Sequence, residues 1–371
     1  MHISEPPNGR ALAKLRKRRD RLNAKAASVG QATWSVRALA SGPGIPAVYV
    51  RNEFVDMALS GVQLRGDPSD RRLSVKEDRP PAARLITPRG AALRVFLTAL
   101  FEAQARTRPG QRPGNTRPLA SRAGGVISWI DLLASDAEPY GKGKHHMSVS
   151  AKKTRQMETA IDRLAKEELV ELTRTGEPGT RKYEGFVLMH EGGRRPHGPN
   201  IPYQVPVVPP EQAFPVPVTL FTNGWIHILE DSELAFILMM AAAHHATGGQ
   251  AFTITAENRL LRFGMKHDGY EAHMMLSRLG LVTVTPVDRR RPDGTVEDFN
   301  LEGPRVPTCS ASSQPDDSLW LKTSTRPTVT TLCEPEEHCR ITVAAAPAYR
   351  PARRAGGRSH WRAREGHQVP P

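Results

Sequence analysis

The stretch Arg278-Leu279-Gly280-Leu281-Val282-Thr283-Val284 joins two local signals within a few residues. Gly280 follows a helical pattern, and glycine adopts at little cost the left-handed conformation in which many helices end. Residues 281–285 are of the apolar and β-branched types that favour a strand. The sequence therefore predicts a helix that ends at Gly280 and passes directly into a strand.

The segment around this stretch, residues 218–302, is predicted to be a folded unit of three helices and a hairpin. Its first helix is apolar nearly all round, and its second is short and broken by Gly264. The hairpin turns through residues 288–294, DRRRPDG. The expected elements are helices over 232–245, 255–263 and 267–279 and strands over 281–285 and 295–301.

An earlier segment, residues 85–190, repeats this order of elements. Thr87-Pro88 has the hydroxyl cap and the proline of a helix start, and Ser150 can cap a third helix. A long basic loop, residues 106–122, follows the first helix. The expected elements are helices over 91–106, within 126–133 and over 151–167 (apolar face Met157, Ala160, Ile161 and Leu164) and strands over 169–173 and 183–189.

Three helices followed by a two-stranded hairpin is the winged-helix plan. Arg278–Val284 resembles the end of the third helix and the first wing strand of bacterial winged helix-turn-helix regulators, and Ala256–Met265 resembles their second helix and turn. The counterpart Arg163–Leu172 is looser, with Glu168 where a helix-ending glycine is usual. The resemblance covers 219–302 and, less closely, 87–189. It implies duplex DNA binding, with the third helix in the major groove and the hairpin on the backbone or the minor groove. Protein-binding and RNA-binding members also belong to this superfamily.

The expected fold class is mainly α with small β-hairpin wings (α+β), formed by two tandem winged-helix domains. Leu12, Leu15, Leu22 and Ala26 have heptad-like spacing, so the basic N-terminal arm can form a short helix, although we expect the arm and the tail to be disordered. The expected divisions are a basic arm (1–30), a poorly structured or weakly extended segment (31–84), the first domain (85–190), a Pro-rich linker (191–217), the second domain (218–302) and a disordered tail (303–371).

The charge balance favours a polyanionic partner. The chain of 371 residues has 52 Lys and Arg against 38 Asp and Glu, a formal net charge of +14. Its three cysteines form no disulfide framework, and neither a membrane-spanning apolar run nor a secretory signal is visible. We therefore expect a cytoplasmic, nucleoid-associated protein without membrane contact.

In the first unit, basic side chains lie off the apolar face of the third helix. Arginine can bind guanine and glutamine can bind adenine through paired hydrogen bonds, whereas lysine mostly meets phosphate. A solvated charged face is the plain alternative. The candidate DNA-binding residues are Lys152, Lys153, Arg155, Gln156, Thr159 and Arg163 on the helix and Arg174, Arg181 and Lys182 on the wing.

In the second unit, the third helix is nearly neutral and the wing is strongly basic. We expect backbone or minor-groove contact by the wing more than base reading by the helix. The apolar helix around 236–243 is expected to face the other unit, a second subunit or its own core. The candidate DNA-binding residues are Lys266, His267, Arg278, Arg289, Arg290 and Arg291.

The sequence contains few of the motifs that indicate an enzyme. Gly141-Lys142-Gly143-Lys144 lacks the frame of a phosphate-binding loop, and no Gly-x-Ser-x-Gly elbow occurs. Cys309, Cys333, His338 and Cys339 match no common zinc spacing. We therefore expect no catalytic residue, metal, cofactor or small-molecule effector.

These observations favour sequence-specific binding of double-stranded DNA by a bacterial transcriptional regulator or a mobile-element DNA-binding protein. Two linked winged-helix units also resemble theta-type plasmid replication initiators, which is one alternative. A winged-helix scaffold that binds protein is another. A homodimer is compatible with each of them.

Overall fold

The computed structural model describes most of the chain up to residue 282 and a short piece beyond it. The described residues are 9–40, 45–57, 79–87, 90–120, 125–135, 148–172, 182–194, 199–209, 211–248, 252–254, 256–266, 269, 271–282 and 308–309.

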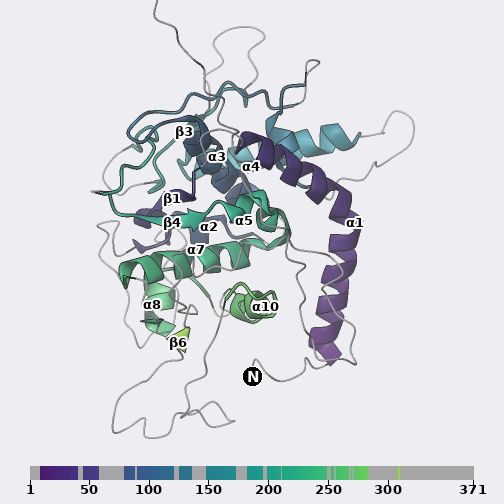
Figure 1. The fold of residues 1–371 in the computed structure, drawn as a ribbon, viewed down its shortest axis with the longest axis vertical. Coiled ribbons are helices and arrows are strands. Elements are labelled where there is room, and N and C mark those ends of the chain that lie inside the picture. The colour runs from purple at the N-terminus through teal and green to yellow at the C-terminus, as the bar shows by residue number, and fades with distance from the viewer. Residues whose placement is uncertain are drawn as a thin grey trace, which may run out of the picture.

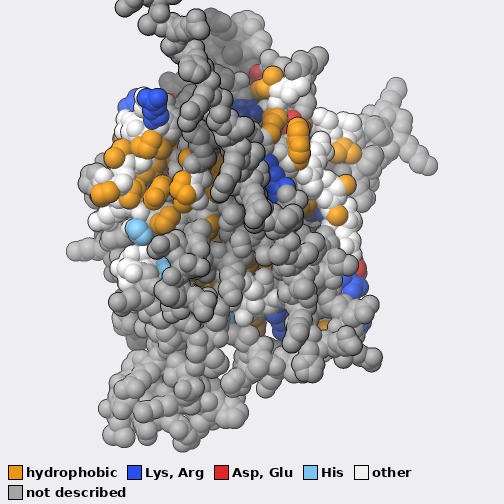
Figure 2. Space-filling view, viewed as in Figure 1, with side chains coloured by type: hydrophobic (Ala, Val, Ile, Leu, Met, Phe, Trp, Pro, Cys, Tyr) orange, Lys and Arg blue, Asp and Glu red, His pale blue; other side chains and the backbone are white. Residues whose placement is uncertain are grey.

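The described chain is mainly helical, with small antiparallel strand pairs, which confirms the coarse α+β expectation. Figure 1 shows α1 along one side of the molecule and α7 across its middle, and the same face in Figure 2 carries Lys and Arg side chains at several separate places. The elements are α1 (Gly9–Leu39), β1 (Ala47–Arg51), the 3-10 helix η1 (Asn52–Phe54), α2 (Pro81–Leu85), α3 (Ala92–Arg106), the 3-10 helix η4 (Trp129–Leu132), α4 (Val149–Lys166), β2 (Val170–Glu171), β3 (Val187–Leu188), β4 (Ala213–Pro217), α5 (Thr219–Thr222), α6 (Trp225–Ile228), α7 (Asp231–Ala246), β5 (Phe252–Thr253), α8 (Ala256–Leu261), α10 (Ala272–Arg278) and β6 (Thr308–Cys309).

The Pro-rich segment expected to be a linker supplies a buried strand. β4 pairs antiparallel with β1, so the linker expectation is wrong at 213–217, whereas β1 is an extended strand in the segment expected to be poorly structured or weakly extended. Tyr49 stands opposite Pro215, and its backbone N–H and C=O bind the Gln104 side chain at 2.8 and 2.7 Å. Because these groups point away from β4, Pro215 needs no donor, which lets a proline-rich sequence form a strand.

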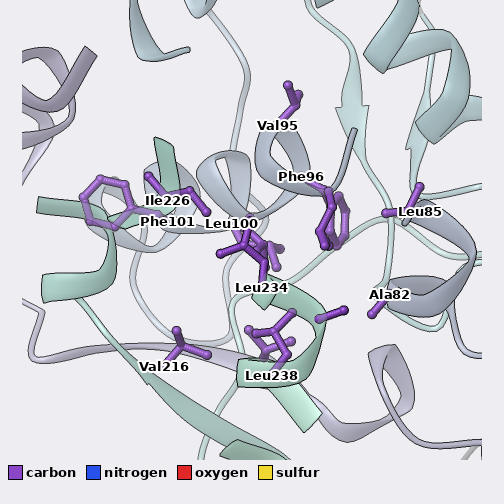
Figure 3. Close-up of a cluster of buried hydrophobic side chains, with 14 of the residues drawn as sticks. Ala82, Leu85, Val95, Phe96, Leu100, Phe101, Val216, Ile226, Leu234 and Leu238 are labelled. Atoms are coloured by element: carbon purple, nitrogen blue, oxygen red, sulfur yellow. The ribbon is translucent and has the colours of Figure 1, made fainter. Parts of the chain in front are cut away.

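One hydrophobic core joins the two segments that we expected to be separate domains. α7 packs against β4, α10 and α2, and its residues from Leu234 to Ala242 are all buried. α7 is apolar on all sides because other elements pack around it. Side chains from both expected units contribute to the core in which it lies. Figure 3 shows side chains from α2, α3, β4, α6 and α7 together in this core, among them Ala82, Leu85, Phe96, Leu100, Val216, Ile226, Leu234 and Leu238.

The N-terminal arm is an ordered helix from Gly9 onward, which corrects the expectation of disorder. Leu15 and Leu22 are buried, as their heptad-like spacing suggests, and Arg18 lies on the same face and is equally buried. Arg18 forms a two-pronged ion pair with Glu233 of α7, with Nη2 2.7 Å from Oε2. A long basic helix thus docks on the body because an acidic partner from another element neutralises its inward-facing charge.

Two helix starts in the first segment lie later or earlier than expected. α3 begins at Ala92, since Thr87 turns its backbone N–H and hydroxyl toward Asp231 of α7 at 3.4 Å instead of capping. α4 is capped by Ser148, whose Oγ accepts a hydrogen bond from Ala151 N at 3.1 Å, and not by Ser150. At the start of α4 the sequence offers two hydroxyls, Ser148 and Ser150, and local cap chemistry alone does not choose between them.

The end of the helix at Gly280 is as predicted, but Leu281 and Val282 are not in a strand, which differs from the expected direct passage into one. Gly280 has φ +69°, and Leu281 N donates to Leu276 O at 2.9 Å, which closes the end of α10. The remainder of the expected second hairpin, with its strands over 281–285 and 295–301, lies outside the described residues. Within the expected disordered tail, β6 pairs with β5, which differs from that expectation, and the rest of the tail is outside the described residues.

Candidate nucleic-acid interface

α4 is amphipathic and turns its apolar face to the body. Met157, Ala160, Ile161 and Leu164 are buried where α4 packs on α3 and η4, as the spacing predicted. β2 follows α4 directly and pairs with β3, so a small hairpin stands beside the helix, as expected for residues 169–189. The opposite face of α4 is therefore the surface that remains for a partner.

The first turns of this outer face carry unneutralised positive charge. Arg155 is exposed and Lys153 half-buried, and neither side chain forms a hydrogen bond or an ion pair with another described residue. The exposed hydroxyl of Thr159 donates to Arg155 O at 2.8 Å and keeps its acceptor lone pairs free for a ligand. Lys152 is half-buried and has an interaction within the protein.

Gln156 is half-buried, and its amide oxygen is already bound within the protein. Its Oε1 accepts a hydrogen bond from Ser135 Oγ at 2.7 Å. Ser135 N in turn donates to Ser28 Oγ of α1 at 3.0 Å. This chain of contacts ties α4 to the end of the η4 segment and to α1, so we assign Gln156 a structural role.

Arg163 also has a structural role, because its guanidinium is bound to other residues of the protein. Its Nη2 donates to Arg84 O at 2.9 Å and lies 3.1 Å from Glu167 Oε1. Glu167 pairs with Arg84 as well, at 3.2 Å. Burial lowers the pKa of Arg84, and Arg194 and Arg163 add to that effect against the attraction of Glu167. The carboxylate of Glu167 is thus needed to hold two guanidinium groups at the end of α4.

Lys182 is the candidate residue of the first wing that the structure describes, and it forms an ion pair with Asp162 of α4. Lys182 Nζ lies 3.0 Å from Asp162 Oδ1, and Tyr183 OH donates to Asp162 Oδ2 at 2.8 Å. The hydrogen bond to Asp162 raises the pKa of Lys182, so the ammonium stays charged. Asp162 neutralises part of the basic surface and sets the place of the hairpin beside the helix.

In the second unit, the described candidates are Lys266, which is exposed, and Arg278, which is half-buried in the last turn of α10. Neither side chain has a hydrogen bond or ion pair with another described residue. The remaining candidates of both units lie outside the described residues. They are Arg174 and Arg181 of the first unit and His267, Arg289, Arg290 and Arg291 of the second.

One basic surface was absent from our candidate residues. Arg108 and Arg112 are exposed in the loop between α3 and η4. The signal available in the sequence was the lack of any Asp or Glu from 103 to 130 beside several arginines. Basic composition alone assigns this loop no role.

Within the described ranges, no three His, Cys, Asp or Glu side chains are grouped as a metal site would require. The described helices include none that is both long and apolar enough to cross a bilayer. Comparison with protein-family models gives no match, and no significantly similar protein is found among curated sequences or solved structures.

Proposed function

We propose that this protein binds double-stranded DNA through the outer face of α4. The observation that carries the proposal is Arg155, an exposed guanidinium on the helix that no described acidic residue neutralises, beside Lys153 and Thr159. Arginine pairs with guanine O6 and N7, and a hydroxyl and an ammonium suit the phosphates that position a helix in the major groove.

The order α3, η4, α4, β2 and β3 supports a winged-helix arrangement for the first unit. α4 packs on α3 and on η4, which leaves its first turns outward, and the hairpin lies beside it. The order α7, α8 and α10 followed by the Gly280 turn supports a second unit of the same plan. In winged-helix proteins the third helix and the hairpin are the parts that reach DNA.

The shared core supports a fixed spacing between the proposed DNA-contacting surfaces of the two units. Since β1, β4 and α7 connect the two segments, the contact surfaces are held apart by a packed interior and not by a flexible linker. This arrangement suits one continuous binding site. We propose a role as a transcriptional regulator or mobile-element DNA-binding protein, with a theta-type replication initiator as the alternative.

The alternative of a protein-binding scaffold has less support than the sequence suggested. Its motivations were the apolar helix around 236–243, which is the buried middle of α7, and the Pro-rich connector, of which residues 213–217 form the buried strand β4. A pull-down whose captured partners resist nuclease treatment would favour the scaffold.

The test is selection of random duplex DNA by the full chain, followed by gel shifts with Arg155→Ala. We expect one enriched sequence, and in the variant a loss of discrimination of about 1–3 kcal/mol, which is about five- to 160-fold, at one position of the site. Lys166→Ala is the matched control, because Lys166 is exposed in the last turn of the same helix. No enriched sequence, or an affinity that salt does not change, would contradict the proposal.

A further inference from the structure

The loop from Arg106 to Arg117, here called the arginine loop, joins α3 to the η4 region. Between residues 106 and 118 it contains Arg, Thr, Pro, Gly, Gln and Asn and none of the larger apolar types. Arg108, Gly110, Gln111, Arg112 and Thr116 are all exposed. A protein interface usually needs a buried aromatic or aliphatic anchor, and this loop offers none.

The arginine loop is held in one shape by hydrogen bonds to distant segments. Gly110 N donates to Val205 O at 2.8 Å, and Val205 N donates to Gln111 O at 3.0 Å. Asn115 Nδ2 donates to Phe186 O at 3.0 Å, next to β3. Gly110 has φ +82°, so a glycine is required at this turn. A loop fixed in this way loses little conformational entropy when it binds a ligand.

The four arginines of the loop divide into two structural and two outward-facing residues. Arg106 Nε and Arg117 Nη2 both pair with the buried carboxylate of Glu102, at 2.7 and 2.9 Å. Arg106 Nη2 also donates to Gly114 O at 2.9 Å. Arg108 and Arg112 make no side-chain hydrogen bond or ion pair with any described residue. The fold therefore satisfies the first pair internally and presents the second pair to solvent.

We propose that the arginine loop binds the phosphate backbone of duplex DNA through Arg108 and Arg112. The inference rests on the proposed DNA binding and adds to it a second contact region, formed by other elements than α4. Guanidinium forks, hydroxyls and exposed backbone amides are the groups that most often contact phosphate. Contacts of this kind add affinity at every sequence and change no sequence preference.

The test compares the full-length double variant R108S/R112S with the wild type on a random-sequence duplex over a salt series. Each lost phosphate contact reduces the magnitude of the slope of log K against log salt by about 0.9, so we expect a reduction of about 1.8 and, if the two lines meet near 1 M salt, about 60-fold weaker binding near 0.1 M salt. The enriched sequence should stay unchanged. R16S/K17S is the matched control, because both residues are exposed on α1 and the charge change is the same.

Unchanged slope in R108S/R112S, or an equal loss in R16S/K17S, would overturn the assignment of this surface. Equal weakening of binding to poly-glutamate would also overturn it, in favour of an acidic polypeptide. DNA binding by α4 and phosphate binding by the arginine loop can be rejected independently of each other. A loss of base discrimination in R155A with normal slope in R108S/R112S rejects the arginine loop alone, whereas wild-type protein that binds no duplex rejects both. A thermal melt of each variant, expected to match the wild type, controls for folding.

Discussion

The imidazole of His227 on α6 is buried, and neither of its ring nitrogens has a hydrogen-bond partner among the described residues. Burial lowers the pKa of His227 to about 3, and the nearby charges of Arg94 and Lys25 add to this effect. The side chain is therefore neutral at pH 7, and protonating it would place an unpaired charge inside the protein.

This histidine makes the folded state sensitive to acid. Its pKa is about 3 when folded and about 6.5 when unfolded, so its contribution is complete above pH 6.5 and is lost as pH falls toward 3. We expect wild type to lose about 2–3 kcal/mol more than His227→Leu between pH 7 and 4.5. Urea unfolding at several pH values measures this. His245→Gln, an exposed control, should follow the wild type, and equal pH slopes in wild type and His227→Leu would reject the explanation.

Glu168, at the end of α4, adopts a left-handed backbone conformation that is usually taken by glycine. The sequence placed it where a helix-ending glycine is usual, and it is the only non-glycine residue with positive φ (+57°) in the described chain. That conformation costs an L-residue roughly 1–2 kcal/mol. The backbone oxygen of Glu168 accepts a hydrogen bond from Asn200 Nδ2 at 2.7 Å, which helps to hold the turn. The pattern thus identified the conformation even though the residue departs from it.

At the scale of elements, α1 depends on charge pairs with the start of α7. Glu230 and Glu233 form the capping box of α7, and the same two carboxylates receive Arg21 and Arg18. The Arg18 pair is buried, whereas both partners of the Arg21 pair are about half exposed. The two pairs lie one turn apart on one helix and differ mainly in contact with water.

This difference predicts unequal costs for two similar substitutions. Arg18→Ala leaves the buried Glu233 without its cation and should cost about 3–5 kcal/mol of unfolding free energy. Arg21→Ala removes a solvent-screened pair and should cost about 1 kcal/mol or less. Urea titration of both variants measures the difference. Equal costs would mean that α1 docks through its leucines alone.

At the scale of the whole molecule, the shared core predicts a single cooperative unfolding transition. β1 and β4 are far apart in sequence and pair directly, and α7 packs on β4, α10 and α2 and pairs with Arg94 of α3 through Asp231. We expect calorimetric and van't Hoff enthalpies to agree, and we expect a fragment of residues 218–302 to remain unfolded alone because its core partners are missing. Two resolved transitions, or a folded fragment, would restore the two-domain arrangement.

Several elements were predictable because their signals are local. The ranges of α3, α4 and α7 and the end of α10 follow from helical spacing and from Gly280, and the apolar face of α4 was named residue by residue. The candidate interface was predictable only in part. Spacing placed Arg155, Gln156 and Arg163 off the apolar face, but it could not show that Ser135 holds Gln156 or that Arg84 and Glu167 hold Arg163.

The sequence by itself determined the order of α3, α4 and the hairpin that follows them, and the helical range of α7, because periodicity and chain-breaking residues act over a few positions. Only the tertiary structure decided that β4 is a strand, that α1 is docked and that one core joins the two segments. Each of these depends on a partner far away in the chain, as in Arg18 with Glu233 or Arg51 with Ala213. An arginine is equally basic whether a carboxylate meets it or not, so its freedom to bind DNA is a property of the fold and not of the residue.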